Sequence, residues 1–451
     1  MFAPAWLLYL GLLQWSVVRF RVPIVLGLTL CAVLLAWWVL RRSTVRLGRV
    51  TAVVLLAGSA AVTAYVPLFT YLTGGARTLA VGLLIGTALL AAAALGGPWA
   101  GRPWSPRAVA VLSAVSYAAL TAVAVRGDPS PRIDVWVTLQ QASDALWRGE
   151  NFYAMTWVDS PGVKDAFTYL PWTTVLLAPG RWLLGDVRWM LGLWMLVAFA
   201  GIWRLAGPDR RWLGALAIAA LAVAPGTLTQ VDQAWTEPLL LAGLVWWAVL
   251  VREGRAWWAV LPLAAVCASK QHLALVAVVL LFWRPFGWRR TLVTGALTAA
   301  LIAPWVVASP ADFVHDTVTL LVGFHPIKFA NTWYLLALNV YGVTLPFWAT
   351  GLVVVGVLTL AAWLAHRRQP EVGELLRMLA LVLLVANLVN KQAFYNQFWL
   401  SAALVAVSTV TGPGRGNVAS SVRAAGGTWS IARRARVMAG RAARAPRATA
   451  G

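Results

Sequence analysis

Long apolar runs recur along almost the whole chain, and many approach the ~20 residues that a helix needs to cross the hydrocarbon core of a bilayer. Of its 451 residues, 61% are hydrophobic and 12% are charged. A membrane-spanning strand alternates apolar and polar residues, whereas runs such as 81–95 and 292–307 do not alternate. Because only helices and closed barrels satisfy their backbone groups within a membrane, the sequence predicts an all-α, polytopic membrane protein.

Thirteen of these runs are predicted spans, at residues 23–40, 50–72, 77–95, 107–125, 189–206, 212–229, 237–251, 256–269, 271–283, 291–308, 343–365, 375–390 and 397–411. Residues 5–18 are a candidate for one more. Two spans, 256–269 and 271–283, are short, so we interpret them as a re-entrant pair with residues 270–272 at its tip. The alternative is one long tilted helix with a buried Lys, which costs several kcal/mol unless the charge is paired.

The charge is strongly basic, with a formal net charge of +22. Most Arg residues lie in short segments between apolar runs, which is the positive-inside pattern of cytoplasmic loops. This pattern holds along the whole chain only if residues 170–184 form a half-helix and do not span. Pro171 and Pro179 favour a half-helix, because each removes a backbone donor. Topology and attraction to anionic lipids, at about 1 kcal/mol per basic residue, explain the charge, so nucleic acid is not an expected partner.

The last forty residues differ from the rest in composition. Residues 412–451 are rich in Gly, Ala, Ser and Arg, with no acidic residue and few large apolar ones. We interpret them as a disordered, basic cytoplasmic tail that contacts anionic membrane lipids. The two cysteines, Cys31 and Cys267, lie in apolar segments without neighbours spaced for a metal site, and they indicate no disulfide framework.

Most of the Asp, Glu, Lys, His, Asn and Gln residues lie in other segments than most of the Arg residues. In the predicted topology they gather on the extracytoplasmic face, in the clusters Arg126–Tyr169, Gln230–Glu237, Lys270–His272, Asp312–Lys328 and Lys391–Gln397. Ionisable groups at membrane depth are costly and usually face a cavity or a partner. Five such clusters on one face predict a hydrated extracytoplasmic cavity that holds an anionic ligand.

Asp134 is the candidate general base, about ten residues past the predicted span 107–125. A carboxylate in such a cavity can take a proton from a hydroxyl that attacks a phosphate-linked carbon. The structural alternative is a helix N-cap or a loop salt bridge, for example with Arg132.

Two further clusters supply hydrogen-bond donors suited to a phosphate group. Lys270, Gln271 and His272 offer a point charge and two polar side chains. A similar set lies between two late spans, namely Lys391, Gln392, Asn396 and Gln397. The alternative for each Lys is snorkelling of its charge to the membrane interface.

Asp232 and Glu237 flank an Asp-Gln-Ala-Trp-Thr-Glu run. They are candidates to orient an acceptor hydroxyl or, with Asp134, to hold a divalent cation. A hard cation prefers several oxygen ligands, and the sequence shows no compact acidic cluster, so no metal or other cofactor is expected. His325 is a candidate for a ligand-binding role, although an ordinary solvated loop explains it equally well.

The segment Asp134 … Ala142 … Ala145-Leu146 … Gly149 … Tyr153 … Phe167-Thr168-Tyr169-Leu170-Pro171 resembles the first large extracytoplasmic loop of the GT-C glycosyltransferases. Within them it is most similar to the opening of glycosyltransferase family 87. Polar positions of that family also resemble Ala268-Ser269-Lys270-Gln271-His272 and Asn390-Lys391-Gln392 … Asn396. The resemblance covers roughly residues 107–411.

The resemblance implies a GT-C helical bundle in the plasma (inner) membrane. It implies inverting transfer of a hexose, usually mannose, from a polyprenyl-phosphate donor to a lipid-anchored or glycan acceptor outside the membrane. Asp134 is then the general base, Lys270, His272 and Lys391 hold the donor phosphate, and aromatic residues such as Tyr169 stack on sugar.

The resemblance divides the chain into a group of additional transmembrane helices at 1–105, a catalytic membrane core at 106–411 with its loop at 126–170, and the tail. Two departures from the family are visible. About four hydrophobic helices precede the loop where one is usual, and Trp172 follows Pro171 where a second Pro is common.

Two other classes remain open at this point. A transporter or flippase for an anionic glycolipid would also be polytopic, but such proteins tend to show internal repeats and ionisable groups near the membrane midplane. Here no repeat is visible, and the ionisable groups gather on one face. A non-catalytic scaffold of envelope assembly is the third class.

Overall fold

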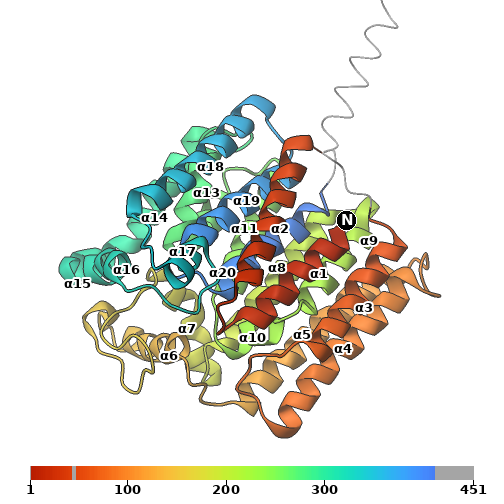
Figure 1. Cartoon of the computed structure of the whole chain (residues 1–451), viewed down its shortest axis with the longest axis horizontal. Coiled ribbons are helices and arrows are strands. Elements are labelled where there is room, and N and C mark those ends of the chain that lie inside the picture. Colours follow the sequence, from red (N-terminus) through yellow and green to blue (C-terminus); the bar gives the residue numbers. More distant parts are fainter. Residues whose placement is uncertain (1, 43–46, 412–451) are drawn as a thin grey trace, which may run out of the picture. The chain divides into compact units, whose positions relative to one another are not determined.

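The computed structural model describes residues 2–42 and 47–411, and every regular element among them is a helix (Figure 1). Up to Thr411 the chain forms one compact unit. The helices of residues 1–105 belong to that unit, and the functional boundary at 105 stays a prediction. The predicted tail at 412–451 lies outside the described residues.

The first half of the chain forms α1 (Phe2–Ser16), α2 (Val22–Arg41), α3 (Arg49–Tyr65), α4 (Gly74–Gly96), α5 (Ser105–Gly127), α6 (Asp134–Trp147), α7 (Trp172–Leu184) and α8 (Arg188–Ala206). The second half forms α9 (Arg211–Ala222), α10 (Thr227–Asp232), α11 (Glu237–Arg252), α12 (Val260–Cys267), α13 (Ala274–Leu280), α14 (Gly287–Ala308), α15 (Pro310–Val314), α16 (Leu320–Gly323), α17 (Trp333–Tyr341), α18 (Phe347–Arg368), α19 (Val372–Val389) and α20 (Tyr395–Ser408). Short 3₁₀ turns occur at η1 (Phe152–Ala154), η2 (Pro208–Arg210) and η3 (Gln271–Leu273), and η4 (His315–Thr319) is a π-helix.

Within residues 2–42 and 47–411, seven helices are long and apolar enough to cross a membrane, namely α2, α4, α5, α8, α14, α18 and α19. Each coincides with a predicted span. Only 11% of the apolar window of α14 and 17% of that of α18 are buried in the protein, so most of their side chains are left to face lipid. The prediction of an all-helical membrane protein is therefore confirmed.

The other six predicted spans are shorter or broken helices in the structure. The span 50–72 is wrong at its end: α3 stops at Tyr65 because Val66 precedes Pro67 and takes an extended backbone. The span 212–229 is interrupted where Pro225 and Gly226 separate α9 from α10, and Gly226 has a φ of +81°. Helices α11, α12, α13 and α20 have 16, 8, 7 and 14 residues.

The region around Lys270 forms two short helices and not one long helix, as expected, and the re-entrant course of the pair stays a prediction. Helices α12 and α13 are separated by residues 268–273, and Lys270 in this tip has an extended backbone (φ −149°, ψ 126°). The half-helix predicted at 170–184 is also present as α7, which has 13 residues and begins after Pro171. At about 1.5 Å per residue, α7 is ~20 Å long and too short to span.

Arg-rich loops meet at one end of the bundle, which we call the basic end. Their contacts are Arg42 with Glu374 at 3.3 Å, Arg204 with Glu253 at 2.6 Å, Arg210 with the carbonyl of Thr411 at 2.9 Å, and Arg368 with the carbonyl of Val39 at 2.9 Å. The opposite ends of α5, α8 and α11 lie at Gly127, Arg188 and Glu237, and we call this the polar end. Several of the Arg-rich segments therefore gather at the basic end, and their cytoplasmic location stays a prediction.

A glycine in the half-helix allows its close packing on the turn that follows. A Cβ added at Gly180 of α7 would lie 2.8 Å from the carbonyl oxygen of Asp186 and 3.2 Å from the backbone nitrogen of Met190. Backbone atoms cannot move aside as a side chain can. We expect Gly180→Ala to lower the free energy of unfolding by about 1–3 kcal/mol, the usual cost of overpacking.

Unfolding in mixed detergent micelles, followed by circular dichroism, would measure this change. The matched control is Gly86→Ala in α4, where an added Cβ meets nothing within 4 Å. The control should be neutral or stabilising, because Ala is the better helix former by about 1 kcal/mol. Equal stability of the two variants would contradict the close α7–α8 approach.

Candidate functional site

Asp134 is the first residue of helix α6, whereas the sequence predicted it in a loop. The helix begins here because the apolar residues that follow recur with helical spacing and form one apolar face. One oxygen of Asp134 (Oδ1) accepts a hydrogen bond from the Val135 amide at 2.8 Å, and the carboxyl group is partly buried. A carboxylate in the first turn is stabilised by the helix dipole. The position is therefore fixed by the helix, and the second oxygen remains for other chemistry.

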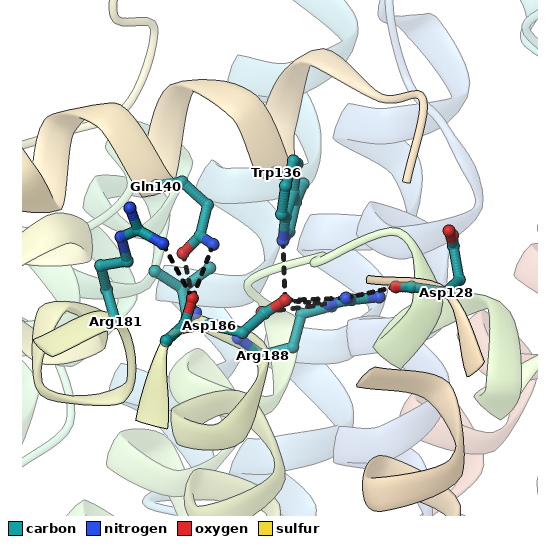
Figure 2. A network of polar contacts seen from close by, with 8 residues as sticks. Asp128, Trp136, Gln140, Arg181, Asp186 and Arg188 are labelled. Atoms are coloured by element: carbon teal, nitrogen blue, oxygen red, sulfur yellow. Dashed lines mark hydrogen bonds and ion pairs between the residues drawn. The ribbon is translucent and has the colours of Figure 1, made fainter. Parts of the chain in front are cut away.

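A buried ion pair fixes α6 from below (Figure 2). Arg188 donates to both oxygens of Asp186, with an Nη2–Oδ2 distance of 2.7 Å, and their side chains are 0% and 8% exposed. The indole nitrogen of Trp136 on α6 donates to Asp186 at 3.0 Å. Arg188 also donates to the carbonyl of Asp128 at 2.6 Å. These contacts join the end of α5, the first turn of α6 and the start of α8.

The rest of α6 is held by the α7–α8 turn. Gln140 donates to the carbonyl of Gly185 at 3.1 Å and accepts from the amide of Val187 at 3.0 Å. Arg181 forms two hydrogen bonds to Asp144, at 2.8 and 2.9 Å. Helix α6 therefore has polar anchors along its length as well as an apolar face, and its first residue has little freedom to shift.

A second buried pair lies at the start of α11. The ammonium of Lys270 lies 2.5 Å from Oε1 of Glu237, and their side chains are 8% and 0% exposed. The same oxygen accepts from Asn396 at 3.0 Å, and Lys270 also reaches the hydroxyl of Thr236 at 3.3 Å. Among the described residues, Oε2 of Glu237 has no hydrogen-bond partner. Three residues that the sequence placed in separate clusters thus meet in one contact.

The turn between α12 and α13 joins the entry to α7. The amides of Leu170 and Trp172 donate to the carbonyls of Ser269 and Ala268 at 3.2 and 3.1 Å. Gln271 donates to the carbonyl of Thr168 at 2.9 Å. These bonds satisfy backbone groups that two short helices would otherwise leave unpaired in the membrane.

Tyr169 is a half-buried residue of the loop that precedes α7. The Lys270 ammonium stands 5.5 Å from the centre of its ring. Burial raises the pKa of the Tyr169 phenol well above its usual range, and the charges of Glu237 and Asp134 raise it further. The phenol therefore stays protonated and senses both carboxylates. Tyr169 therefore lies beside Lys270, whose ammonium pairs with Glu237, and the charge of Asp134 also acts on its phenol.

Asp232 is fully buried in α10. Its Oδ2 accepts from the hydroxyl of Thr70 at 2.9 Å and from the amide of Tyr71 at 2.7 Å. Burial raises the pKa of the Asp232 carboxyl, and these two hydrogen bonds oppose the rise. A role in orienting a ligand hydroxyl stays a prediction for this residue.

The remaining predicted residues have other surroundings. The Lys391 ammonium donates to the carbonyls of Val322 and Phe324 at 2.7 and 2.6 Å, which is a loop-closing role. His325 is exposed and stacks on Phe324 with a centroid distance of 4.5 Å. Gln392 and His272 are half-buried. A pocket that joins Asp134, Lys270 and Lys391 stays a prediction, since the contacts of Lys270 and of Lys391 are made to different partners.

A loop covers the candidate base. Residues 158–165, which we call the strap, are closed at their base by the Trp157 amide, which donates to the carbonyl of Lys164 at 2.6 Å. Gln141 of α6 holds both backbone groups of Val158, at 2.7 and 3.1 Å. At the tip, a Cβ on Gly162 would lie 2.4 Å from Oδ2 of Asp134. Only a glycine can bring the strap this close to the carboxylate.

Among the described residues, no group of three or more His, Cys, Asp or Glu side chains is placed to hold a metal ion. The candidate site is instead built from carboxylates, one ammonium, amides and a phenol. Such a set can accept a proton and form hydrogen bonds to a polar ligand. Comparison with known protein families, curated proteins and solved structures finds no match to this chain.

Sequence reasoning did not single out Asp186, Arg188, Thr70, Tyr71 or Gly162. A signal existed for Arg188, because it starts the predicted span 189–206 on the side where the positive-inside pattern disfavours Arg. The Asp-x-Arg spacing beside a half-helix is a second signal. Thr70 and Tyr71 were hidden, because the predicted span 50–72 placed them inside a helix.

We expect Lys270→Met to lower the free energy of unfolding by about 3–5 kcal/mol, because it leaves the Glu237 charge buried without its partner. The double variant K270M/E237Q should recover most of this loss, since no buried charge remains. Chemical unfolding in mixed micelles measures both. The control is Lys164→Met, which changes an exposed side chain. Similar losses in the single and double variants would show that the pair is not held as described.

We expect Gly162→Ala to speed hydrogen exchange of the Trp157 and Val158 amides by about 10-fold. Overpacking typically costs about 1–3 kcal/mol, and 1.4 kcal/mol corresponds to about tenfold. The added methyl group pushes the strap away from Asp134 and loosens the bonds at its base. Exchange mass spectrometry in nanodiscs measures the rate, with Gly75→Ala as the control, because a Cβ there meets nothing within 4 Å. Unchanged exchange would contradict strap contact with Asp134.

Proposed function

We propose that this protein is an inverting membrane glycosyltransferase of the GT-C type, with more helices crossing the bilayer than the seven longest. It transfers a hexose, with mannose as the first candidate, from a polyprenyl-phosphate donor to a lipid-linked or glycan-linked acceptor. The site faces the extracytoplasmic side of the plasma membrane, and the basic end faces the cytoplasm. The proposal combines the loop resemblance with one observation, the Asp134 carboxylate fixed at the start of α6, and it assigns the Tyr169–Lys270–Glu237 contact to the same site.

The proposed step has a simple balance. An acceptor hydroxyl oxygen attacks the anomeric carbon, and the bond between that carbon and the phosphate oxygen breaks. The hydroxyl proton goes to the Asp134 carboxylate, and polyprenyl phosphate leaves with the electron pair. One base is sufficient, because a phosphate is already a good leaving group.

The contacts favour different roles for Asp134 and Lys270 within the site. Asp134 is anchored on α6, with one oxygen bonded to the helix and the other under the strap. The ammonium of Lys270 is paired with the buried carboxylate of Glu237. We infer that it acts on the donor phosphate as part of the Lys270–Glu237–Asn396 unit and not as a free charge. Tyr169 offers an aromatic face beside this unit.

Lys391, His272, Gln271 and Gln392 stay as proposed donors of hydrogen bonds around the phosphate. Gln271 already bonds to Thr168, so its first role is to hold the tip. Lys391 closes the loop that carries His325, so an effect of either residue on the donor passes through that loop. Movement of the loop toward the lipid carrier is compatible with both roles.

The decisive variant is Asp134→Asn, which keeps the shape of the side chain and removes its basicity. We expect transfer of mannose from polyprenyl-phosphoryl mannose in isolated membranes to fall by at least about 100-fold, the usual range for loss of a general base. Membrane insertion and expression should not change, because the amide oxygen still accepts from Val135. The readout is radiolabelled product in the lipid and glycan fractions.

Asp165→Asn is the matched control, because this carboxylate is exposed on the same loop. It should transfer at the wild-type rate. Wild-type turnover by Asp134→Asn would remove Asp134 as the base. Movement of a labelled glycolipid across liposomes by the purified protein, without any new glycosidic bond, would favour a flippase.

A further inference from the structure

The segment between α3 and α4, residues 66–73, lies at the polar end and touches residues far away in the sequence. The hydroxyl of Thr70 and the amide of Tyr71 both donate to Oδ2 of Asp232, at 2.9 and 2.7 Å. Thr229, one turn earlier in α10, donates to the carbonyl of Phe69 at 2.6 Å. Three consecutive residues of this segment therefore hold α10.

The same segment also reaches the entry to α6. The phenol of Tyr71 donates to the carbonyl of Arg132 at 2.7 Å, only two residues before Asp134. Arg132 belongs to the irregular stretch that links α5 to α6, and the other end of this stretch is held by Arg188 through the carbonyl of Asp128. Tyr71 thus fixes the part of the link nearest to Asp134.

The surroundings of the Tyr71 phenol keep its hydroxyl protonated, so that it can donate a hydrogen bond. Burial raises its pKa, and the charges of Asp232, Asp128 and Asp134 raise it further, whereas Arg132 opposes the rise. The phenol keeps its proton across the physiological pH range and can donate throughout. Its ring also packs edge-on against Phe69 at 5.8 Å, which orients the hydroxyl.

Helices α3 and α4 lie side by side next to α5 at one edge of the bundle (Figure 1). Segment 66–73 connects the end of α3 to the start of α4. It lies within residues 1–105, outside the family resemblance, yet it contacts both Asp232 and the stretch that leads to Asp134. Apolar packing of α3 and α4 does not by itself call for the three hydrogen bonds that Thr70 and Tyr71 make to Asp232 and Arg132.

We propose that Thr70 and Tyr71 are positioning residues of the site: together they set the distance between α10 and the start of α6, and so hold Asp134 in place. This inference rests on the proposed function for its catalytic meaning. It gives the N-terminal helices a role in the reaction beyond anchoring the chain. Neither residue needs to touch the substrate for this role.

The first test does not depend on any activity. Tyr71→Phe keeps the ring that packs on Phe69 and removes only the donor to Arg132. We expect amide exchange across residues 128–135, measured by mass spectrometry in nanodiscs, to become about 5- to 10-fold faster, as for the loss of one hydrogen bond. The matched control, Tyr65→Phe, changes an 88% exposed phenol at the end of α3 and should leave this exchange unchanged.

The second test measures transfer from polyprenyl-phosphoryl mannose. Tyr71→Phe should lower kcat by about 10-fold with little change in the KM for this donor, because a displaced base affects the chemical step and not donor binding. Thr70→Val should also lower kcat, whereas Thr70→Ser should retain it, since Ser keeps the hydroxyl that Asp232 accepts. The thermal midpoint should stay within a few degrees of wild type for each variant.

Unchanged exchange in Tyr71→Phe overturns the inference. Faster exchange with a wild-type kcat also overturns it, because the segment would then be held without consequence for the base. No transfer by the wild-type protein overturns the proposed function instead. In that case the exchange comparison still decides whether Tyr71 holds the link to α6.

Discussion

The buried pair of Arg188 and Asp186 is the interaction on which the polar end depends. A guanidinium without solvent exposure is tolerated only when its charge and most of its donors are satisfied, and here a carboxylate and a backbone carbonyl do so. In return, the pair joins three segments: the end of α5, the first turn of α6 and the start of α8, of which α5 and α8 also pack along their length. Through Trp136, Asp186 locates the helix whose first residue is Asp134. Replacing both charged residues with apolar ones would keep a packed bundle but would remove the hydrogen bond from Trp136 that positions α6.

Much of the fold could be predicted from the sequence, because a bilayer leaves a chain few choices. Apolar length identified the seven helices of the described residues that are long enough to span. Pro171 correctly indicated a short helix after it, and the short apolar runs around Lys270 correctly indicated two short helices. The errors came where an apolar run continued past a break in the backbone, as at Pro67 and Pro225. Hydropathy cannot register such a break, because the residues on both sides of it are equally apolar.

The candidate site was predictable in its residue types and less so in its partners. Asp134, Lys270, Glu237, Asn396 and Tyr169 were each singled out, but the ion pair of Lys270 with Glu237 depends on how α11 packs on the turn between α12 and α13. Lys391 looked equivalent to Lys270 in sequence, since both lie beside amides between apolar runs. Their surroundings differ because Lys270 contacts the start of α11, whereas Lys391 contacts the carbonyls of a loop. Contacts such as those of Thr70 with Asp232 join residues 162 positions apart, and no local pattern contains that information.

The bonds between the entry to α7 and the turn between α12 and α13 have a consequence for biogenesis. Residues 268–271 emerge from the ribosome about a hundred positions after their partners at 168–173, and the carbonyls of Ala268 and Ser269 accept hydrogen bonds from those earlier residues. A backbone carbonyl left bare in hydrocarbon costs several kcal/mol, so these bonds favour a fold in which the start of α7 is in place before the turn between α12 and α13 docks on it. The order of synthesis supplies the two partners in that sequence.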